Sequence, residues 1–366
     1  MWMTILLMLP LAGLAYVSWH VWALLPLAGA WKAAVIGIGV CCFLMLFLDL
    51  NGTLDKLPLP LSRILYEIGT SSILVLFYLA MLFLVLDAGR LVHIVPRSWL
   101  YDNWVTAAAV TGLMLTVFVC GNIHYKDKVR VALEIRPEKP LAKDYTIVFC
   151  SDLHLGYHNT RRDLSHWVDL INAEHPDLVL IAGDIIDISI RPLLEEDMAA
   201  EFRRLQAPVY ACLGNHEYYS GSSSAAGFYR DAGITLLRDS FVTIDNTLAL
   251  IGRDDRSNRR RRSLEELTVG VREAEERPYT ILLDHQPHTL KEAEDSGIDL
   301  QLSGHTHRGQ IWPVSWITDA LYECSWGLHQ RGATKYYVSS GLGIWGGKFR
   351  IGTQSEYVVL KLSRKG

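Results

Sequence analysis

Long apolar runs, separated by short polar links, dominate the first third of the chain. The uncharged runs cover residues 1–31, 33–48, 68–86 and 103–125. A helix that crosses a bilayer needs about 20 mostly apolar residues. The pattern therefore predicts a transmembrane module over residues 1–121, with helices near 3–25, 30–49, 67–87 and 103–121. A cleaved signal peptide is the alternative for the first run, but that run lacks a basic start and other spans follow it.

The pattern changes after residue 121. A basic, proline-containing stretch at 122–143 is predicted to connect the membrane module to a second domain over residues 144–366. In that domain, short apolar runs typical of buried strands alternate with segments of helical periodicity, which predicts an α/β fold. The predicted strands are Tyr145–Cys150, Leu178–Ala182, Val209–Leu213, Ile281–Leu283, Leu300–Leu302 and Tyr336–Val338. The predicted helices cover 161–174, 191–205, 263–276 and 287–296.

The distribution of charge also separates two parts of different kind. The chain has 366 residues, 50% hydrophobic and 20% charged, yet only five basic and five acidic residues fall within 1–120. This contrast excludes a single uniform soluble domain, and the high apolar content excludes a disordered chain. The formal net charge of −4 gives no reason to expect nucleic acid as a partner.

Basic residues near the predicted spans indicate how the module is oriented. With four spans, the N-terminus, the loop 50–66 and the second domain share one side of the membrane. That side carries Lys56, Arg63, Lys126, Lys128 and Arg130, and the other side carries Lys32, Arg90 and Arg97. Because cytoplasmic loops are enriched in Lys and Arg, this count favours a cytoplasmic second domain.

Residues of metal-binding type follow several of the predicted strands. Asp152 and His154 follow the first strand, and a spacing of two places both side chains on one face of an extended segment. His305 and His307 repeat this spacing. Since α/β folds gather the carboxyl ends of their strands at one edge, the sequence predicts a metal site at that edge.

These clusters carry a family resemblance. The residues in question are Asp152-x-His154, Gly183-Asp184, Gly214-Asn215-His216-Glu217, His285 and Gly304-His305-x-His307. In this pattern, the segment 144–362 resembles the calcineurin-like metallophosphoesterases, and Tyr337–Gly343 resembles their membrane-associated bacterial branch. The resemblance implies a two-sheet αββα sandwich with a binuclear metal centre, so the expected architecture is a four-helix transmembrane module followed by this α/β domain.

The resemblance also implies a ligand set. One metal would be held by Asp152, His154, Asp184 and His307, and the other by Asp184, Asn215, His285 and His305, with Asp184 as the bridge. Oxygen and imidazole ligands without thiolate suit two divalent ions, with Mn expected first and Fe, Mg, Ni or Zn as alternatives.

The expected chemistry is hydrolysis of a phosphoester. Two cations neutralise the phosphate oxygens, and a hydroxide that bridges them attacks phosphorus. His216 occupies the family's position for a general acid that protonates the leaving oxygen. Weaker candidates for substrate contacts are Arg161, Arg162, Arg253, Lys348 and Arg350. The arginine run 259–262 is interpreted as a mobile surface segment, with contact to anionic headgroups as the alternative.

The membrane module indicates the class of substrate. A bilayer confines an enzyme and a lipid-linked substrate to one surface, so we expect hydrolysis of a phosphodiester or pyrophosphate bond in an amphiphile. The similar bacterial branch includes hydrolases of UDP-2,3-diacylglucosamine in lipid A synthesis, which implies a multi-pass protein of the bacterial inner membrane. The alternatives are a phosphodiesterase acting on soluble or nucleotide substrates, with the helices as an anchor, and a non-catalytic membrane scaffold. The sequence leaves the oligomeric state open.

Overall fold

The computed structural model describes residues 2–273 and 277–364. The chain forms two compact units. The helical unit comprises Met1–Ile123 and Gly346–Lys348, and the α/β unit comprises His124–Trp345 and Phe349–Gly366. Each unit is described by itself below.

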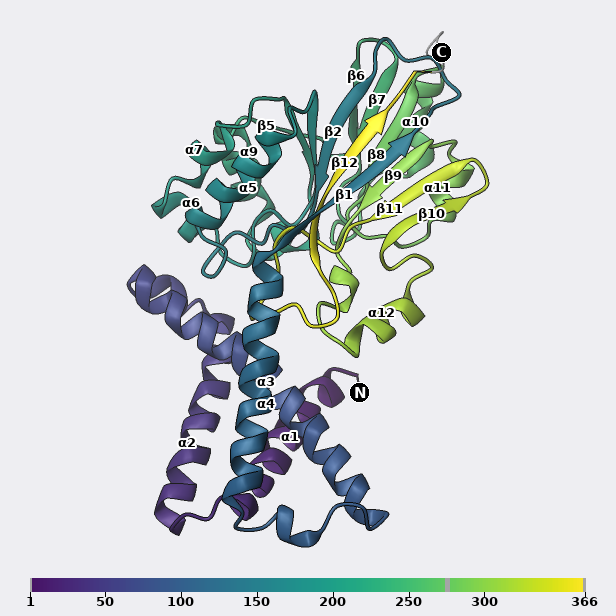
Figure 1. Cartoon of the computed structure of the whole chain (residues 1–366). Coiled ribbons are helices and arrows are strands. Elements are labelled where there is room, and N and C mark those ends of the chain that lie inside the picture. The colour runs from purple at the N-terminus through teal and green to yellow at the C-terminus, as the bar shows by residue number, and fades with distance from the viewer. Residues whose placement is uncertain (1, 274–276, 365–366) are drawn as a thin grey trace. The chain divides into compact units, whose positions relative to one another are not determined.

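Within its described residues, the helical unit contains α1 (Trp2–Leu24), α2 (Gly29–Met45), α3 (Leu59–Leu91) and all but the last three residues of α4 (Trp104–Lys126) (Figure 1). It also contains the short 3-10 helices η1 (Leu46–Asn51), η2 (Leu54–Lys56) and η3 (Arg97–Trp99). Three helical segments there are long and apolar enough to cross a membrane, namely Gly29–Leu50, Leu59–Leu91 and Trp104–Lys126. The prediction had four. In α1 the described side chains begin at Met8, and the apolar helix Met8–Leu24 is shorter than a span.

Helix α3 is longer than the predicted span 67–87. It begins after Pro58, and Pro60 is tolerated because the first turn of a helix has no use for its missing N–H. Close packing occurs at Gly69, where an added Cβ atom would lie 2.6 Å from the backbone nitrogen of Leu46. Glycine at such positions lets membrane helices approach each other closely.

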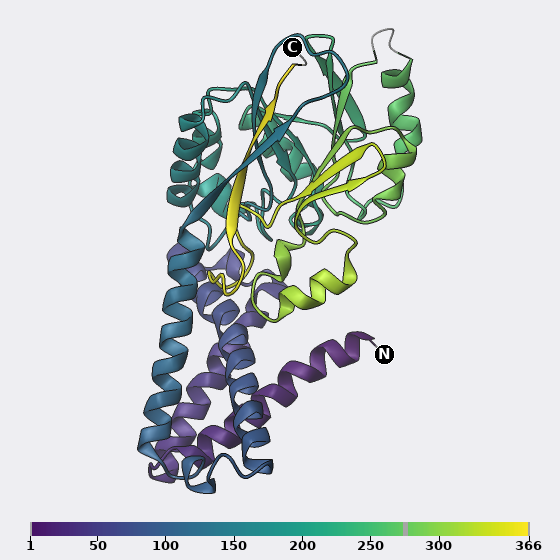
Figure 2. The same cartoon turned by 45° about the vertical axis from the view of Figure 1, so that its right-hand side comes forward.

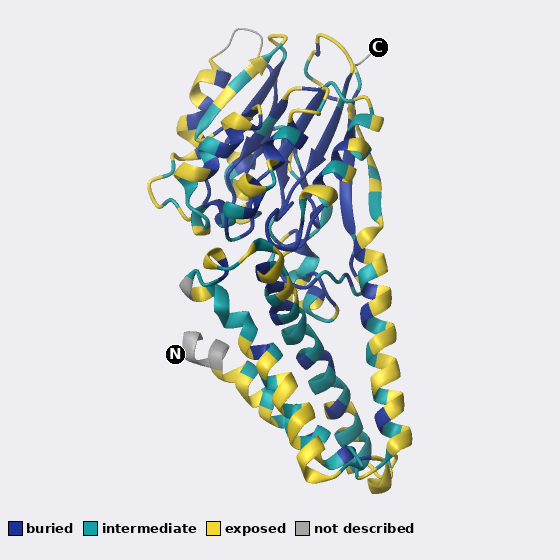
Figure 3. Cartoon of the chain, turned by 90° about the vertical axis from the view of Figure 1, so that its left-hand side faces the viewer, coloured by how far each residue is buried: buried dark blue, intermediate teal, exposed yellow. Residues whose placement is uncertain are grey.

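The outer surface of the helical unit is apolar. Large hydrophobic side chains such as Ile38, Val85, Val105 and Leu115 are more than half exposed, and exposed residues run along the lengths of the helices in Figure 3. Soluble proteins rarely expose apolar patches of this extent. The surface therefore suits a bilayer.

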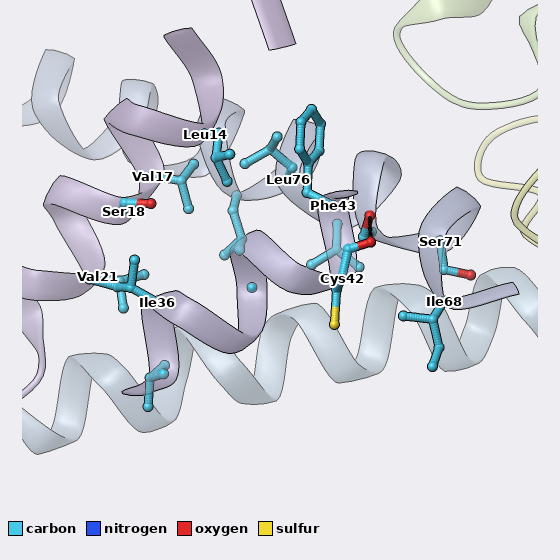
Figure 4. Close-up of a pocket in the computed structure, with 15 residues that line it drawn as sticks. Leu14, Val17, Ser18, Val21, Ile36, Cys42, Phe43, Ile68, Ser71 and Leu76 are labelled. Carbon is cyan, nitrogen blue, oxygen red and sulfur yellow. Dashed lines mark hydrogen bonds between the residues drawn. The ribbon is translucent and has the colours of Figure 1, made fainter. Parts of the chain in front are cut away.

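A cavity of about 470 Å³ lies among α1, α2 and α3 (Figure 4). Its wall is almost wholly apolar, with residues such as Val17, Ile36 and Leu76. One of the few hydroxyl groups there, Ser72 Oγ, donates to the carbonyl oxygen of Gly69 at 2.6 Å. The cavity therefore resembles the helix surface in its polarity.

In the described part of the α/β unit, the strands form two six-stranded mixed sheets (Figure 1). The first sheet has the order β1 (Lys128–Ile135), β12 (Ser355–Leu362), β2 (Tyr145–Cys150), β3 (Leu178–Ala182), β4 (Val209–Cys212) and β5 (Ile234–Leu236). The second has the order β10 (Gly327–Arg331), β11 (Thr334–Val338), β9 (Leu300–Ser303), β8 (Tyr279–Leu283), β7 (Leu248–Gly252) and β6 (Ser240–Ile244). Strands β2, β3, β4 and β5 pair in parallel, as do β7, β8, β9 and β11.

The two sheets pack face to face, and helices cover their outer faces (Figure 2). Residues such as Phe149, Leu180, Leu250 and Ile281 fill the space between the sheets. The first half of the domain contains helices α5 (Arg161–Ala173), α6 (Arg191–Glu195), α7 (Met198–Phe202), α8 (Asn215–Tyr219) and α9 (Ser222–Asp231). The second half contains α10 (Leu264–Arg272), α11 (Lys291–Asp295), η4 (His307–Gly309) and α12 (Val314–Leu321). This is an αββα sandwich, as predicted.

Two segments differ from their predicted structure. The stretch Lys128–Ile135, assigned to a connector, forms β1 and pairs with β12 in parallel. Its alternation of polar and apolar residues is the period of a strand whose one face is buried. The predicted helix 191–205 is divided into α6 and α7, because Asp197 between them takes a left-handed backbone conformation with φ of 48°.

Candidate metal centre

Loops at the carboxyl ends of the strands supply the site. Asp152 and His154 follow β2, Asp184 follows β3, Asn215 follows β4, His285 follows β8, and His305 and His307 follow β9. Parallel strands of each sheet end at the same edge, and the face-to-face packing of the sheets places those two edges together. Every predicted metal ligand therefore lies in one place, although the ligands come from residues 152–307.

Their ligand atoms lie close together. Three groups have ligand atoms that all lie within 4.8 Å of one another: Asp152, His154 and His307; His154, Asp184 and His216; and Asp184, His285 and His305. His154 and Asp184 each belong to two groups. The side chains of Asp152, His154, Asp184 and His285 are at most 2% exposed.

The hydrogen bonds at His285 indicate that a cation belongs here. Its Nδ1 lies 2.7 Å from the carbonyl oxygen of Ala182, so this nitrogen carries the proton and Nε2 presents a lone pair. That lone pair faces the Asp184 oxygen Oδ2 at 3.1 Å, outside hydrogen-bond geometry. Two buried acceptors at this distance repel unless positive charge lies between them.

The same situation recurs at neighbouring ligands. His154 Nδ1 lies 3.2 Å from the carboxylate of Asp187, which leaves the lone pair of Nε2 facing Asp184 Oδ2 at 3.7 Å and His307 Nε2 at 3.0 Å. Asn215 Oδ1 is buried and has no hydrogen-bond partner among the residues that the structure describes. Buried polar atoms normally have partners. Carboxylate, amide oxygen and imidazole donors without thiolate fit a pair of divalent cations.

Backbone strain is concentrated in these loops. Left-handed φ values occur at Asp152 (55°), His154 (45°), Asp184 (52°), His305 (71°) and His307 (48°). Such conformations cost roughly 1–3 kcal/mol each in residues other than glycine and persist where the surroundings enforce them. Here the left-handed conformations direct side chains that are two positions apart in the chain toward one centre.

Glycines allow the loops to approach this closely. A Cβ atom at Gly304 would collide with the carboxylate of Asp152, and one at Gly214 would collide with the carboxylate of Asp184. Both glycines come directly before residues of the site. Glycine is required at these positions because of the limited space around the two carboxylates.

Asp187 is a functional residue that the sequence analysis missed. This carboxylate is 1% exposed, and its Oδ1 lies 3.2 Å from both His154 Nδ1 and His216 Nδ1. Burial raises the pKa of Asp187, but the hydrogen bonds with His154 and His216 outweigh it, so the pKa lies well below its usual value. The ionised carboxylate therefore selects the tautomer of His154 that presents Nε2 to the centre. Its position three residues after Asp184 was the available signal.

Glu217 connects two of the loops. Its carboxylate accepts hydrogen bonds from the backbone nitrogens of Asp184 (3.0 Å), Ile186 (2.9 Å) and Gly214 (2.7 Å). The side chain is fully buried and holds the loop after β3 against the start of α8. It positions ligands and is not one of the groups that converge on the centre.

His216 is placed differently from the ligands. Its side chain is 15% exposed, and its Nδ1 lies 3.1 Å from the backbone carbonyl oxygen of Asp187 and 3.2 Å from the carboxylate of the same residue. Its ring meets that of His154 edge to face, with centroids 4.4 Å apart. Burial lowers the pKa of His216, but the charges of Asp184 and Asp187 outweigh it and raise the pKa to about 9. An imidazolium at the solvent-accessible edge of the site can donate a proton.

The predicted substrate-contacting residues are not brought together. Arg161 pairs with Glu201, Arg253 pairs with Asp284 and Glu292, and Lys348 lies in the helical unit near Glu67. Arg162 lines another pocket. Arg350 is fully buried and donates to the carbonyl oxygens of His307, Ser340 and Gly343, so it braces the loops from behind and has no exposed face for substrate.

Other side chains form the rim beside His305. The rings of His288 and Tyr322 lie 4.9 Å apart, each 6.4 Å from the ring of His305. The pKa of His288 is lowered, first by burial and then by the charges of Arg256 and Arg261. Arg261, which was predicted to lie in a mobile surface segment, is only 12% exposed and contacts Asp284.

Replacing Asp187 with asparagine should separate positioning from coordination. The amide keeps the shape but cannot hold both histidine Nδ1–H groups as an anion does. We expect activity to fall by about 10–100-fold, the usual effect of losing a carboxylate that orients a metal-binding histidine. Phosphodiesterase rates measured across a Mn²⁺ titration check this. Asp169→Asn, a carboxylate that is 60% exposed, is the control, and equal activity of the two variants would contradict the role.

The comparisons with known proteins agree with this geometry. The family profile described as calcineurin-like phosphoesterase matches residues 145–309. An uncharacterized metallophosphoesterase of Aquifex aeolicus is 34% identical over 241 residues, which cover 63% of this chain and 90% of that protein. A transmembrane protein with metallophosphoesterase domain from Danio rerio is 29% identical over 346 residues, covering 88% of this chain and 72% of that protein.

Other relatives are longer or more distant. The chain spans 61% of the length of an uncharacterized metallophosphoesterase of Helicobacter pylori to which it is 32% identical over 62% of its own residues. Among solved structures, a 5'-nucleotidase precursor from Thermus thermophilus aligns with 60% of this chain and 54% of that one, with 16% identity and a TM-score of 0.40. On its sequence relatives and its buried His/Asp groups, the chain belongs to the calcineurin-like metallophosphoesterases and is a metal-dependent phosphoesterase with a binuclear metal site.

Proposed function

We propose that this phosphoesterase is a multi-pass membrane enzyme that hydrolyses a phosphodiester or pyrophosphate bond in a lipid-linked substrate. The observation that carries the proposal is the pairing of a metal centre with helices whose exposed surface is apolar. We count α1 as a fourth span beside the three long apolar helices. The basic residues that follow α4 favour a cytoplasmic catalytic domain in a bacterial inner membrane.

We assign the metal ligands residue by residue as the resemblance implied. Asp152, His154, Asp184 and His307 hold one cation, and Asp184, Asn215, His285 and His305 hold the other. The lone pairs of His154 and His285, both set by hydrogen bonds at Nδ1, support this assignment. When bound, the cations supply neutralisation of the phosphate oxygens and the acidity needed to ionise a water molecule. Mn²⁺ is the first choice for assays.

Other residues of the chain position the ligands, donate a proton or form the rim of the site. Asp187 and Glu217 hold the ligands in place, and the buried Arg350 supports the loop that carries His307. His216 holds a proton at the edge of the site and delivers it to the departing oxygen. His288, Tyr322 and Arg256 lie on the rim near His305, where a polar headgroup would bind.

A matched pair of substrates tests the lipid part of the proposal. The full-length protein in detergent with Mn²⁺ is offered a nucleotide sugar that carries two acyl chains, such as UDP-2,3-diacylglucosamine, and the same nucleotide sugar without acyl chains. We expect kcat/KM to be at least about tenfold higher for the acylated compound, because remote binding energy contributes to catalysis. Bis-p-nitrophenyl phosphate reports whether the centre is active at all.

The outcomes distinguish the alternatives. Equal kcat/KM for the acylated and the deacylated compound, with bis-p-nitrophenyl phosphate turned over, would reject a lipid substrate and leave the helices as an anchor. Absence of turnover on all substrates, in protein shown to contain two metals, would reject the catalytic function itself.

A further inference from the structure

A second polar pocket lies in the α/β unit, away from the metal ligands. Its volume is about 500 Å³, within the range of small-molecule sites. The wall is formed by the last residues of α4, the first residue of β1 and the start of α5. None of the residues assigned to the metal centre lines it.

The pocket is basic. Lys126, Lys128 and Arg162 contribute three positive charges, His166 adds an imidazole, and Asp163 is the one carboxylate in the lining. That carboxylate is already engaged, because it accepts hydrogen bonds from the backbone nitrogen (2.9 Å) and hydroxyl (3.1 Å) of Thr160 at the start of α5. The lining offers no further carboxylate for Lys126, Arg162 and His166.

The floor of the pocket is rigid. Tyr125 and Trp167 are both 2% exposed, and the Tyr125 hydroxyl donates to Asn159 Oδ1 at 2.6 Å. Lys128 Nζ donates to the Tyr125 carbonyl oxygen and lies 3.5 Å from the Tyr125 ring centroid and 5.3 Å from that of Trp167. One cation is thus held over an aromatic floor before any ligand arrives.

The other cations point to a ligand from outside. Lys126, Arg162 and His166 are exposed, and within residues 2–273 and 277–364 none of the three has an ion-pair partner. Three cationic or protonatable groups around one hollow attract an anion. The chemistry of the lining suits a phosphate group.

The position of the pocket along the chain identifies the source of that phosphate. Lys126 is the last residue of α4, which is one of the candidate membrane spans. By chain continuity, a pocket that includes Tyr125 and Lys126 lies where the span leaves the hydrocarbon, at the level of the lipid headgroups. We propose that this pocket binds the headgroup phosphate of an anionic phospholipid, as a site separate from the catalytic centre.

Native mass spectrometry of the full-length protein tests this directly. The detergent-solubilised protein is titrated with phosphatidylglycerol or with phosphatidylcholine of the same acyl chains. We expect the parent protein to retain phosphatidylglycerol in preference to phosphatidylcholine. Lys126→Gln combined with Arg162→Gln should weaken phosphatidylglycerol binding by at least about tenfold, because each basic residue near an anionic headgroup contributes to the binding free energy. Arg230→Gln, which removes an 82% exposed arginine from α9, is the matched control and should bind like the parent.

Other results would overturn the proposal. Equal retention of the two lipids, or unchanged phosphatidylglycerol binding in the double variant, would exclude a headgroup site here. Displacement of the lipid by millimolar inorganic phosphate would assign the pocket to a soluble anion instead. Thermal melting and metal content establish that each variant is folded. If the melting temperature of the double variant is below that of the parent, Arg162→Gln alone gives the same comparison. The readout is binding, so it does not depend on the substrate proposed above.

Discussion

Replacing Asp184 with alanine is expected to remove both metals and all measurable turnover. Asp184 belongs to two of the three ligand groups, and one of its oxygens faces the lone pairs of both His154 and His285. Its loss leaves those nitrogens without the anion that they share. The fall in kcat/KM should exceed the roughly 10–100-fold typical of an outer carboxylate such as Asp187. Metal analysis of the purified protein together with a phosphodiesterase assay checks both parts.

Two controls make the Asp184 result specific. Asp169→Ala removes an exposed carboxylate from α5 and should retain metal and activity. A circular dichroism melt shows whether Asp184→Ala is folded, since its backbone nitrogen also holds Glu217. If Asp184→Ala kept two metals per chain, the assignment of Asp184 as the shared ligand would be wrong.

His216→Ala should keep the metals and lose rate. The side chain touches Asp187 and the ring of His154 and is more exposed than the ligands, so its removal leaves the coordinating groups in place. A general acid typically contributes about 10²–10⁴-fold to the rate. The loss should be largest for a substrate whose departing oxygen is strongly basic, because such an oxygen needs the proton most.

A comparison of leaving groups tests the His216 role most sharply. p-Nitrophenolate departs without help, so His216→Ala should be impaired far less on bis-p-nitrophenyl phosphate than on a phosphodiester with an alkyl leaving group. Equal losses on both substrates would argue for a positioning role instead of proton donation. Loss of metal equal to that of Asp184→Ala would identify His216 as a ligand.

The pH dependence expected for the free site follows from the same geometry. With its pKa raised to about 9, His216 is protonated at neutral pH and loses its proton only as the pH rises through that value. Cations held by Asp184 would offset part of the carboxylate charge that causes this rise, so their binding would lower the pKa of His216. The direction, a proton held at neutral pH and lost in alkali, is what a general acid requires.

Much of the α/β domain could be predicted because its signals are local. Strands such as Leu178–Ala182 and Tyr145–Cys150 are short apolar runs that end at polar clusters, and the structure has the same bounds. The predicted ligands lie directly after such strands, so their places in the fold followed from the positions of the strands. Strand β1 was missed because its alternating residues were interpreted as a basic linker, and only its partner β12, more than 200 residues away, makes it a strand.

The features that were missed or misplaced depend on contacts distant in sequence. Asp187 matters because the loop after β3 turns it toward His154 and His216. Arg350 looked like a rim residue in sequence, yet folding places it behind the loop of His307, where backbone carbonyls satisfy it. A basic residue can bind substrate or support a loop, and the amino-acid sequence alone does not distinguish these two roles.

By itself, the sequence determined the apolar helical region, the α/β class and the residue types of the metal centre, because each rests on local periodicity or on residues that follow a strand. The tertiary structure decided which nitrogen of each histidine faces the centre, which carboxylates support it, and which arginines are occupied elsewhere. Those properties arise from hydrogen bonds between loops far apart in the chain, such as Asp187 with His154 and His285 with Ala182. Face-to-face packing of the two sheets, with the carboxyl ends of their parallel strands at one common edge, brings such loops within bonding distance.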